Sequence, residues 1–303
     1  MPRPQDGAAR RESAESAAGP GPVVVTGATG TVGSLVAGRL AAAGVPVRAL
    51  TRDPVAAARA GVPGDPVRAD FADGAGLARA FAGADAVFVV TGDPLEPRHD
   101  ENVIEAARRS GVRHLVKLSA LAVDDPGADD VLTEWQRENE QRLAASGLVG
   151  TLLRPRAFMT NTLHWAPGVR SSGTVRALHA DSRNACVDPA DIADVAVRVL
   201  TDPEAEGRAW DLTGPEPVSA RDQAARIAEA TARPVRCEEL TVDEALAGWR
   251  RHLPEVLVQA RLRSAERQRA GAKERVADGV AEALGRPPGS YAAWARKHAD
   301  AFR

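Results

Sequence analysis

The chain has 303 residues, a formal net charge of −2 at pH 7 and 44% hydrophobic residues. This length allows one large α/β domain with a smaller lobe, and the near-neutral charge favours neither nucleic acid nor a membrane surface as a partner. No apolar run reaches the ~18 residues that span a bilayer, and the N-terminus lacks the apolar region of a signal peptide. The two cysteines, Cys186 and Cys237, lack metal-type spacing, so we expect reduced thiols, no metal and a cytoplasmic location.

Residues 1–21 consist largely of Pro, Gly, Ser, Ala and charged residues without periodicity, which predicts a disordered leader. The globular part is expected to begin at Pro22. An apolar run rich in β-branched residues follows at once, from Val23 to Thr26, and is typical of a buried strand.

Glycines at positions 27, 30 and 33 separate this strand from a segment with valine and leucine at helical spacing. Such glycines permit a tight turn, a close approach of the backbone to a pyrophosphate, and close packing of the helix on the strand. The free N–H groups and the positive end of the helix dipole would hold the phosphates. A glycine-rich turn without a ligand is the alternative. We predict a dinucleotide-binding turn whose phosphate contacts are Gly27, Thr29, Gly30, Thr31 and Val32.

A second apolar strand, residues 45–50, ends at Thr51 and Arg52. Dinucleotide-binding folds that prefer NAD usually place a carboxylate here, whereas a guanidinium can clamp the 2′-phosphate of NADP. We therefore expect NADPH as the cofactor and Arg52 as its 2′-phosphate ligand. NADH stays possible because Asp53 follows one residue later, and a solvated loop charge is the alternative role for Arg52.

Strands are expected next at residues 67–70, 84–90 and 114–119, and helices at residues 74–81 and 100–110. This alternation predicts a parallel, doubly wound sheet with right-handed crossovers. In such a sheet the carboxyl ends of the strands line the ligand crevice. The candidates for the walls around adenine and ribose are therefore Asp70, Phe71, Thr91 and Gly92.

Four short motifs resemble the short-chain dehydrogenase/reductase superfamily: TGATGTVG at residues 26–33, ADF at 69–71, VVTG at 89–92 and VKLSA at 116–120. The runs at residues 134–161 and 188–234 are similar to its atypical, NmrA-like branch, which also holds NADPH quinone reductases. The resemblance covers about residues 22–303. It implies an α/β, Rossmann-type fold with an NAD(P)-binding core at residues 22–155. Residues 156–303 would then complete this core and form a substrate lobe.

The Tyr-x-x-x-Lys pair with which most of this superfamily protonates its carbonyl substrates is missing. The single tyrosine, Tyr291, lies near the C-terminus, and the three lysines are Lys117, Lys273 and Lys297. Ser119 matches the serine of the superfamily and is the candidate catalytic residue at the nicotinamide end. An unassisted hydroxyl is nevertheless a poor acid at neutral pH.

Three functions are compatible with the missing pair. The first is an NADPH-dependent ketoreductase for an aromatic, polyketide-type ketone, protonated by its own hydroxyl or by water. The sequence is similar to tyrosine-lacking ketoreductases of the simocyclinone type, which implies a role in antibiotic biosynthesis. The second is a quinone or azo-dye reductase, and the third is an NADP-binding redox sensor of the NmrA type. We favour the first, with a small aromatic ketone or quinone as partner and a monomer or homodimer as the assembly.

The chain after the strand at residues 150–154 favours an enzyme. Two helix patterns, at residues 253–260 and 276–284, predict an antiparallel pair that closes as a lid and excludes water from the hydride. The same helices could instead form the partner surface of a sensor. The residues expected to line the nicotinamide end are Pro155, Ala157 and Phe158.

Four further positions lie outside the expected cofactor contacts. His164 could act as a general acid, although a packed or exposed loop histidine is the simpler interpretation. Glu138 and Glu140 are expected on the solvated face of a charged helix. Asp188 is expected to begin a helix whose residues Ile192, Val195 and Val199 pack inward.

Overall fold

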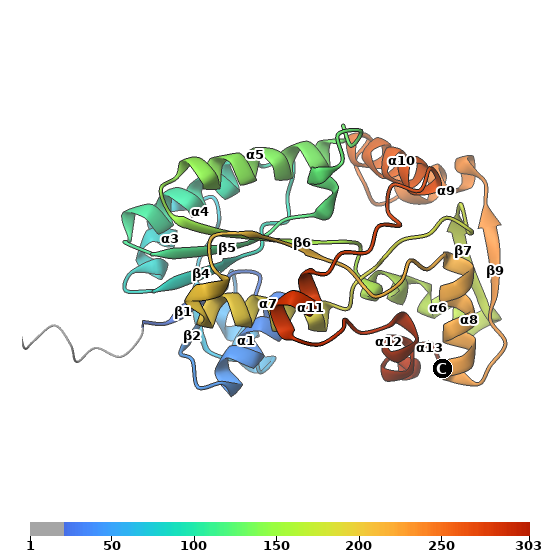
Figure 1. Cartoon of the computed structure of the whole chain (residues 1–303), viewed down its shortest axis with the longest axis horizontal. Helices are drawn as coiled ribbons and strands as arrows, with labels where there is room; N and C mark the ends of the chain where they lie inside the picture. Colours follow the sequence, from blue (N-terminus) through green and yellow to red (C-terminus); the bar gives the residue numbers. More distant parts are fainter. Residues whose placement is uncertain (1–20) are drawn as a thin grey trace, which may run out of the picture.

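Seven parallel strands form the central sheet of the computed structural model, which describes residues 21–303 (Figure 1). Their order is β3-β2-β1-β4-β5-β6-β8, and each neighbouring pair runs parallel. This is the doubly wound, Rossmann-type α/β sheet expected from the sequence. The expected leader lies outside the described residues, except for Gly21. The strands are β1 (Val23–Val25), β2 (Val47–Thr51), β3 (Asp65–Arg68), β4 (Ala86–Val89), β5 (His114–Leu118), β6 (Val149–Pro155) and β8 (Ala209–Leu212).

Helices cover both faces of this sheet (Figure 1). One face carries α1 (Gly33–Ala42), α7 (Pro189–Thr201) and α11 (Gly279–Leu284). The other carries α3 (Gly74–Phe81), α4 (Arg98–Arg109) and α5 (Val131–Ala145), while α2 (Pro54–Arg59) lies against β2 and β3. Within residues 21–303, no helix combines the length and the apolar character that crossing a bilayer requires.

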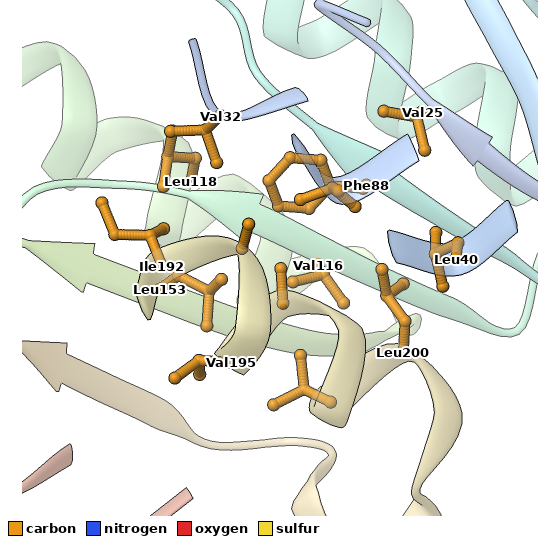
Figure 2. Packing of buried hydrophobic residues seen from close by; sticks show 14 of the residues in the cluster. Val25, Val32, Leu40, Phe88, Val116, Leu118, Leu153, Ile192, Val195 and Leu200 are labelled. Carbon is orange, nitrogen blue, oxygen red and sulfur yellow. The ribbon is translucent and has the colours of Figure 1, made fainter. Parts of the chain in front are cut away.

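The core between the sheet and α1 and α7 consists almost entirely of aliphatic side chains (Figure 2). Leu40 of α1 and Phe88 of β4 are fully buried in it. Asp188 begins α7, as expected, because its carboxylate accepts from the N–H of Ala190 at 2.8 Å. The apolar stripe of α7 therefore meets the sheet as the sequence predicts, through Ile192, Val195 and Val199.

A second lobe is built mainly from the chain after β6. Its parallel strand pair is β7 (Thr174–Leu178) and β9 (Arg236–Leu240). Its core contains Tyr291 and Trp294, and the hydroxyl of Tyr291 donates to Thr162 at 2.9 Å. The helices of this lobe are α6 (Ala166–Ser172), α8 (Ala220–Thr231), α9 (Val242–Arg250), α10 (Glu255–Arg269), α12 (Tyr291–Lys297) and α13 (Ala299–Phe302). Short 3-10 turns are η1 (Leu121–Asp124), η2 (Met159–Trp165) and η3 (Pro203–Ala205).

The predicted lid of two antiparallel helices is wrong in its second half. The first pattern becomes α10, which stands over the second lobe (Figure 1). The second pattern becomes α11, which packs on α7 and β8. Val280 and Ala283 bury their side chains in the same core as α1. Helical periodicity identified the apolar face of α11 but not the surface that it covers.

Replacing Gly33 with alanine tests the close packing of α1 on the glycine turn. A Cβ at Gly33 would lie 2.2 Å from the carbonyl oxygen of Gly27, whereas a Cβ at Gly38 of the same helix meets nothing closer than 3.8 Å. We expect G33A to lower the free energy of unfolding by about 1–3 kcal/mol, as overpacking does. The control G38A should raise it by about 0.5–1 kcal/mol, because alanine favours the helix. Urea unfolding measures both, and equal stabilities would contradict the close contact.

Candidate active site

A cavity of about 630 Å³ lies at the carboxyl ends of the first strands of the sheet. The strand order reverses between β1 and β4, which is where doubly wound sheets bind their ligands. Six of the residues predicted for the cofactor line this cavity: Gly27, Thr29, Arg52, Asp70, Phe71 and Gly92.

The turn between β1 and α1 has the geometry that a pyrophosphate needs. Gly27 has a φ of +59°, and the N–H of Gly30 donates to its carbonyl at 2.8 Å. α1 begins at Gly33, and no side chain of the described residues caps its first N–H groups. Thr31 is exposed, whereas the Val32 side chain is buried, so Val32 offers only its backbone. These features fit the phosphates of a dinucleotide.

Arg52 and Asp53 differ in their availability for a ligand. The carboxylate of Asp53 accepts from the N–H of Ala56 at 2.9 Å and caps α2. Arg52 is exposed on the cavity wall and has no ion pair within residues 21–303. Asp53, the residue that kept NADH possible as a cofactor, is therefore engaged in a helix cap. The guanidinium of Arg52 has no such partner among the described residues.

Thr91 takes part in a buried polar cluster and does not line the cavity. Its hydroxyl donates to Asp100 at 2.7 Å, and Lys117 Nζ lies 2.8 Å from the same carboxylate oxygen. Lys117 also lies 5.3 Å from the ring centre of Trp135. Burial lowers the pKa of Lys117, and Asp100 opposes this shift. The cluster ties β4, β5 and α4 together beneath the cavity.

Ser119 donates its hydroxyl proton to Glu140 at 2.5 Å. Arg154 donates from Nε and Nη2 to the carboxylate of Glu140, at 2.9 and 2.5 Å. It also donates from Nη1 to the carboxylate of Asp124 at 2.7 Å. The expectation that Glu140 lies on a solvated helix face is therefore wrong, because its carboxylate is only 10% exposed and faces β5 and β6. With its proton engaged, Ser119 offers lone pairs rather than a proton to a neighbouring ligand.

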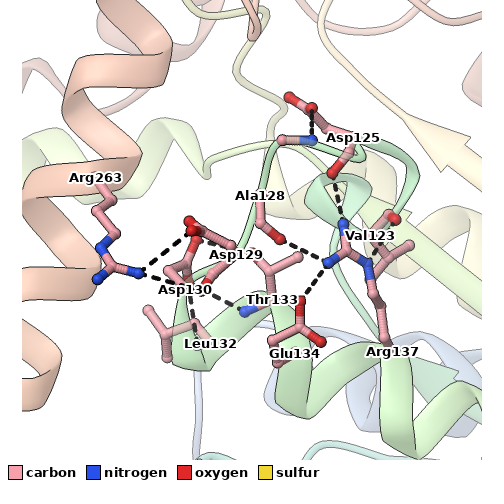
Figure 3. Close-up of polar contacts among 11 residues, drawn as sticks. Val123, Asp125, Ala128, Asp129, Asp130, Leu132, Thr133, Glu134, Arg137 and Arg263 are labelled. Atoms are coloured by element: carbon pink, nitrogen blue, oxygen red, sulfur yellow. Dashed lines mark hydrogen bonds and ion pairs between the residues drawn. The ribbon is translucent and has the colours of Figure 1, made fainter.

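The loop between β5 and α5 is held by one guanidinium (Figure 3). Arg137 donates to the carbonyls of Val123, Asp125 and Ala128, at 3.1, 2.5 and 2.6 Å, and to the carboxylate of Glu134 at 2.6 Å. These bonds satisfy loop carbonyls that no sheet neighbour could reach. The loop therefore has a defined path between β5 and α5.

α10 is fastened to this loop by two ion pairs. Arg263 lies 3.6 Å from Asp129, a contact drawn in Figure 3, and Arg267 pairs with Asp125. The helix therefore has a defined position over the carboxyl ends of β5 and β6.

A second cavity, of about 830 Å³, lies between the end of β6 and the helices of the second lobe. Of the three residues predicted for the nicotinamide end, Ala157 and Phe158 line it, while Pro155 is buried as the last residue of β6. His164 also lines this cavity; its Nδ1–H donates to the backbone carbonyl of Asn161, and burial lowers its pKa.

Sequence reasoning missed the cations around this second cavity. Arg261 of α10 and Lys273 line it, whereas Arg156, which precedes Ala157 in the chain, is buried and is not among the lining residues. Burial lowers the pKa of Lys273 to about 8, with further lowering by Arg156 and Arg267. The one available signal was the scarcity of lysine, since only three occur among 39 basic residues.

Fold and cavities together define an NAD(P)H-dependent oxidoreductase of the Rossmann type. The chain belongs to the NAD(P)H-binding family, whose model matches residues 27–203. The resemblance to the NmrA-like, atypical short-chain reductases is thereby confirmed, as is NAD(P)H as the cofactor.

Two curated relatives are similar along nearly their whole length. The (4-alkanoyl-5-oxo-2,5-dihydrofuran-3-yl)methyl phosphate reductase of Streptomyces griseus is 51% identical, over 92% of this chain and 99% of that protein. The NAD(P)H azoreductase of Xenophilus azovorans is 33% identical, over 92% of this chain and 99% of that protein.

The solved structures include a close match in fold. The NADPH-dependent quinone oxidoreductase QOR2 of Escherichia coli, in complex with NADPH, superimposes with a TM-score of 0.79 and 26% identity. The match covers 91% of this chain and 99% of that chain.

Removing Lys117 tests the buried cluster below the cofactor cavity. K117M should lower the free energy of unfolding by about 3–5 kcal/mol, because Asp100 would be left as a buried charge without its partner. The double variant K117M/D100N should lose much less, since an amide can still accept from Thr91. Chemical unfolding of both variants gives the comparison. A double variant as unstable as the single one would show that the ion pair is not the source of the loss.

Proposed function

We propose that the protein uses NADPH to reduce the ring double bond of a phosphorylated 2-acyl butenolide, the substrate class named for its Streptomyces griseus relative. The observation that carries this proposal is the 51% identity along 99% of that reductase. A matching active site is expected at this level of similarity, and the cationic second cavity suits a phosphorylated ligand.

The chemistry of this substrate class accounts for the missing Tyr-x-x-x-Lys pair. The double bond joins the carbon that bears the phosphomethyl group to the carbon that bears the acyl group and adjoins the lactone carbonyl. Hydride addition at the first carbon leaves the electron pair on the second, where two carbonyls delocalise it, and a proton then adds there. Such a stabilised carbanion needs little help from an acid, so water or a weak donor suffices.

Residues of this chain would position the reaction. Bound NADPH supplies the hydride. The β1–α1 turn, from Gly27 to Val32, would hold the pyrophosphate, and Arg52 the 2′-phosphate. Ser119 and the segment from Pro155 to Phe158 would line the nicotinamide end. Ser119 would accept hydrogen bonds there, because its hydroxyl already donates its one hydrogen bond to Glu140.

Reduction of quinones or azo compounds is the second candidate, and the 33% identity to an azoreductase favours it. Quinones and acyl butenolides share one property: the electron pair received with the hydride is delocalised, so no strong acid is required. The aromatic ketone expected from the sequence differs, because hydride addition to its carbonyl leaves an alkoxide that its own hydroxyl or water would have to protonate. The nature of the acceptor therefore distinguishes the candidates, and the catalytic residues do not.

A substrate panel tests the proposed function. The purified protein and NADPH should oxidise the cofactor fastest with an acyl butenolide phosphate, with kcat/KM at least about tenfold above that for a simple quinone or a hydroxylated aromatic ketone, since one tenfold step is about 1.4 kcal/mol. Loss of nicotinamide absorbance gives the rate, and mass spectrometry should show the gain of two hydrogens. Turnover of the ketone or the quinone alone would overturn the butenolide assignment.

Replacing Arg52 with alanine tests the preference for NADPH. The KM for NADPH should rise roughly 10- to 100-fold, because a charge-assisted hydrogen bond contributes about 1.5–3 kcal/mol, while the KM for NADH stays the same. Arg59, at the end of α2 and outside the cavity lining, provides the matched control R59A. An equal loss for both cofactors in R52A would assign Arg52 a packing role instead.

A further inference from the structure

One face of α10 brings a row of polar residues to the second cavity. Arg261, Ser264 and Gln268 line it at helical spacing. Lys273, in the segment after this helix, donates from Nζ to the hydroxyl of Ser264 at 2.7 Å. Ser264 lies one helical turn from Arg261 on this face, and its bond to Lys273 adds this ammonium to the same row.

Neither of these cations has a carboxylate partner within residues 21–303. The carboxylate of the lining residue Glu244 is engaged, because it accepts from the N–H of Thr241 at 2.9 Å and from Arg176 at 3.0 Å. The cavity therefore has a net positive charge where α10 faces it, although the chain as a whole carries −2.

Arg156 is a third, buried cation, close enough to Lys273 for its charge to lower the pKa of that ammonium, although it does not line the cavity itself. It is 9% exposed, and its guanidinium makes no hydrogen bond or ion pair with any side chain in the part of the chain that the structure describes. The nearby carboxylates of Asp124 and Asp211 are bound by Arg154 and Arg275, at 2.7 and 2.9 Å. A buried charge without a partner is costly to the fold, so Arg156 calls for an anion that the chain itself does not provide.

We propose that Arg156, Arg261 and Lys273 form the subsite that binds the phosphate monoester of the substrate. This inference rests on the proposed function and names the residues that would recognise its substrate. A phosphate monoester carries close to two negative charges at pH 7 and offers three acceptor oxygens, which suits a cluster of three cations. The phosphates of the cofactor have their own cradle at the β1–α1 turn, in the other cavity.

The charges around Lys273 predict how binding depends on pH. Arg156 and Arg267 repel its ammonium, and Asp130 at the start of α5 attracts it. The hydroxyl of Ser264 accepts a hydrogen bond from this ammonium. Burial and the two arginines lower its pKa to about 8, so the ammonium is lost as the pH rises through this value. Phosphate affinity should therefore fall as the pH rises through a window on the order of one unit around this pKa, from roughly 7.5 to 9. K273M should remove most of this pH dependence.

The direct experiment is calorimetric titration of the NADP⁺-saturated protein with inorganic phosphate. The R261Q and K273M variants should each bind phosphate at least about tenfold more weakly than the wild type, as expected when one charge-assisted contact is lost. R263Q is the matched control, because Arg263 lies on the same helix but pairs with Asp129. Arg261 is exposed, so its replacement should leave the thermal unfolding temperature unchanged.

Two results would overturn the subsite. One is unchanged phosphate affinity in both R261Q and K273M, and the other is phosphate binding that competes with NADP⁺, which would place the anion in the cofactor cradle. Phosphate binding requires no turnover, so the outcome is separate from that of the substrate panel. Binding lost in R261Q would support the subsite even if the enzyme reduced only quinones.

Kinetics with a matched pair of substrates gives a second readout. R261Q should raise the KM for an acyl butenolide phosphate about tenfold, because one charge-assisted contact to its phosphate is lost. The KM for the dephosphorylated compound should not change. An equal rise for both compounds would show that Arg261 only shapes the cavity, which contradicts the proposal.

Discussion

The close contact between α1 and the glycine turn is the constraint on which the rest of the structure depends. Because Gly33 lies against the carbonyl of Gly27, the first helix begins directly above the end of β1, and its N–H groups face the crevice. The parallel register then brings the carboxyl ends of β4, β5 and β6 to the same edge. A chain without this contact could keep its apolar core and still lose the place where a dinucleotide lies.

The two proposed anion sites rely on two different physical solutions. The β1–α1 turn uses backbone N–H groups, which carry no net charge and need no counter-ion when the ligand leaves. The proposed phosphate subsite would use side-chain cations, of which Arg156 is buried and has no side-chain partner within residues 21–303. A cofactor that binds and leaves in every turnover suits the first solution. A site that must select one charged substrate among neutral ones suits the second, since unpaired buried charge penalises neutral ligands.

Local patterns in the sequence predicted the Rossmann sheet, the helix at residues 74–81 and the start of α7 at Asp188 almost to the residue. Strand limits were less accurate, and β3 begins two residues before its predicted start. The helical spacing around Val280 was recognised, but the surface that it covers depends on a chain path that periodicity does not encode. Glu140 was misassigned for the same reason, because its partner Arg154 lies on another element. The roles of the individual site residues remain predictions.

The ion pairs of α10 bear on how the substrate is chosen. Arg263 and Arg267 fasten this helix to the β5–α5 loop, which Arg137 itself holds in place. Because α10 lines the second cavity, these ion pairs tie one side of that cavity to the Rossmann core. Side chains of α9 line the same cavity, so the two helices together set its width. Exchanging side chains along α9 would thus change the shape of this cavity while leaving the glycine turn in the other cavity untouched.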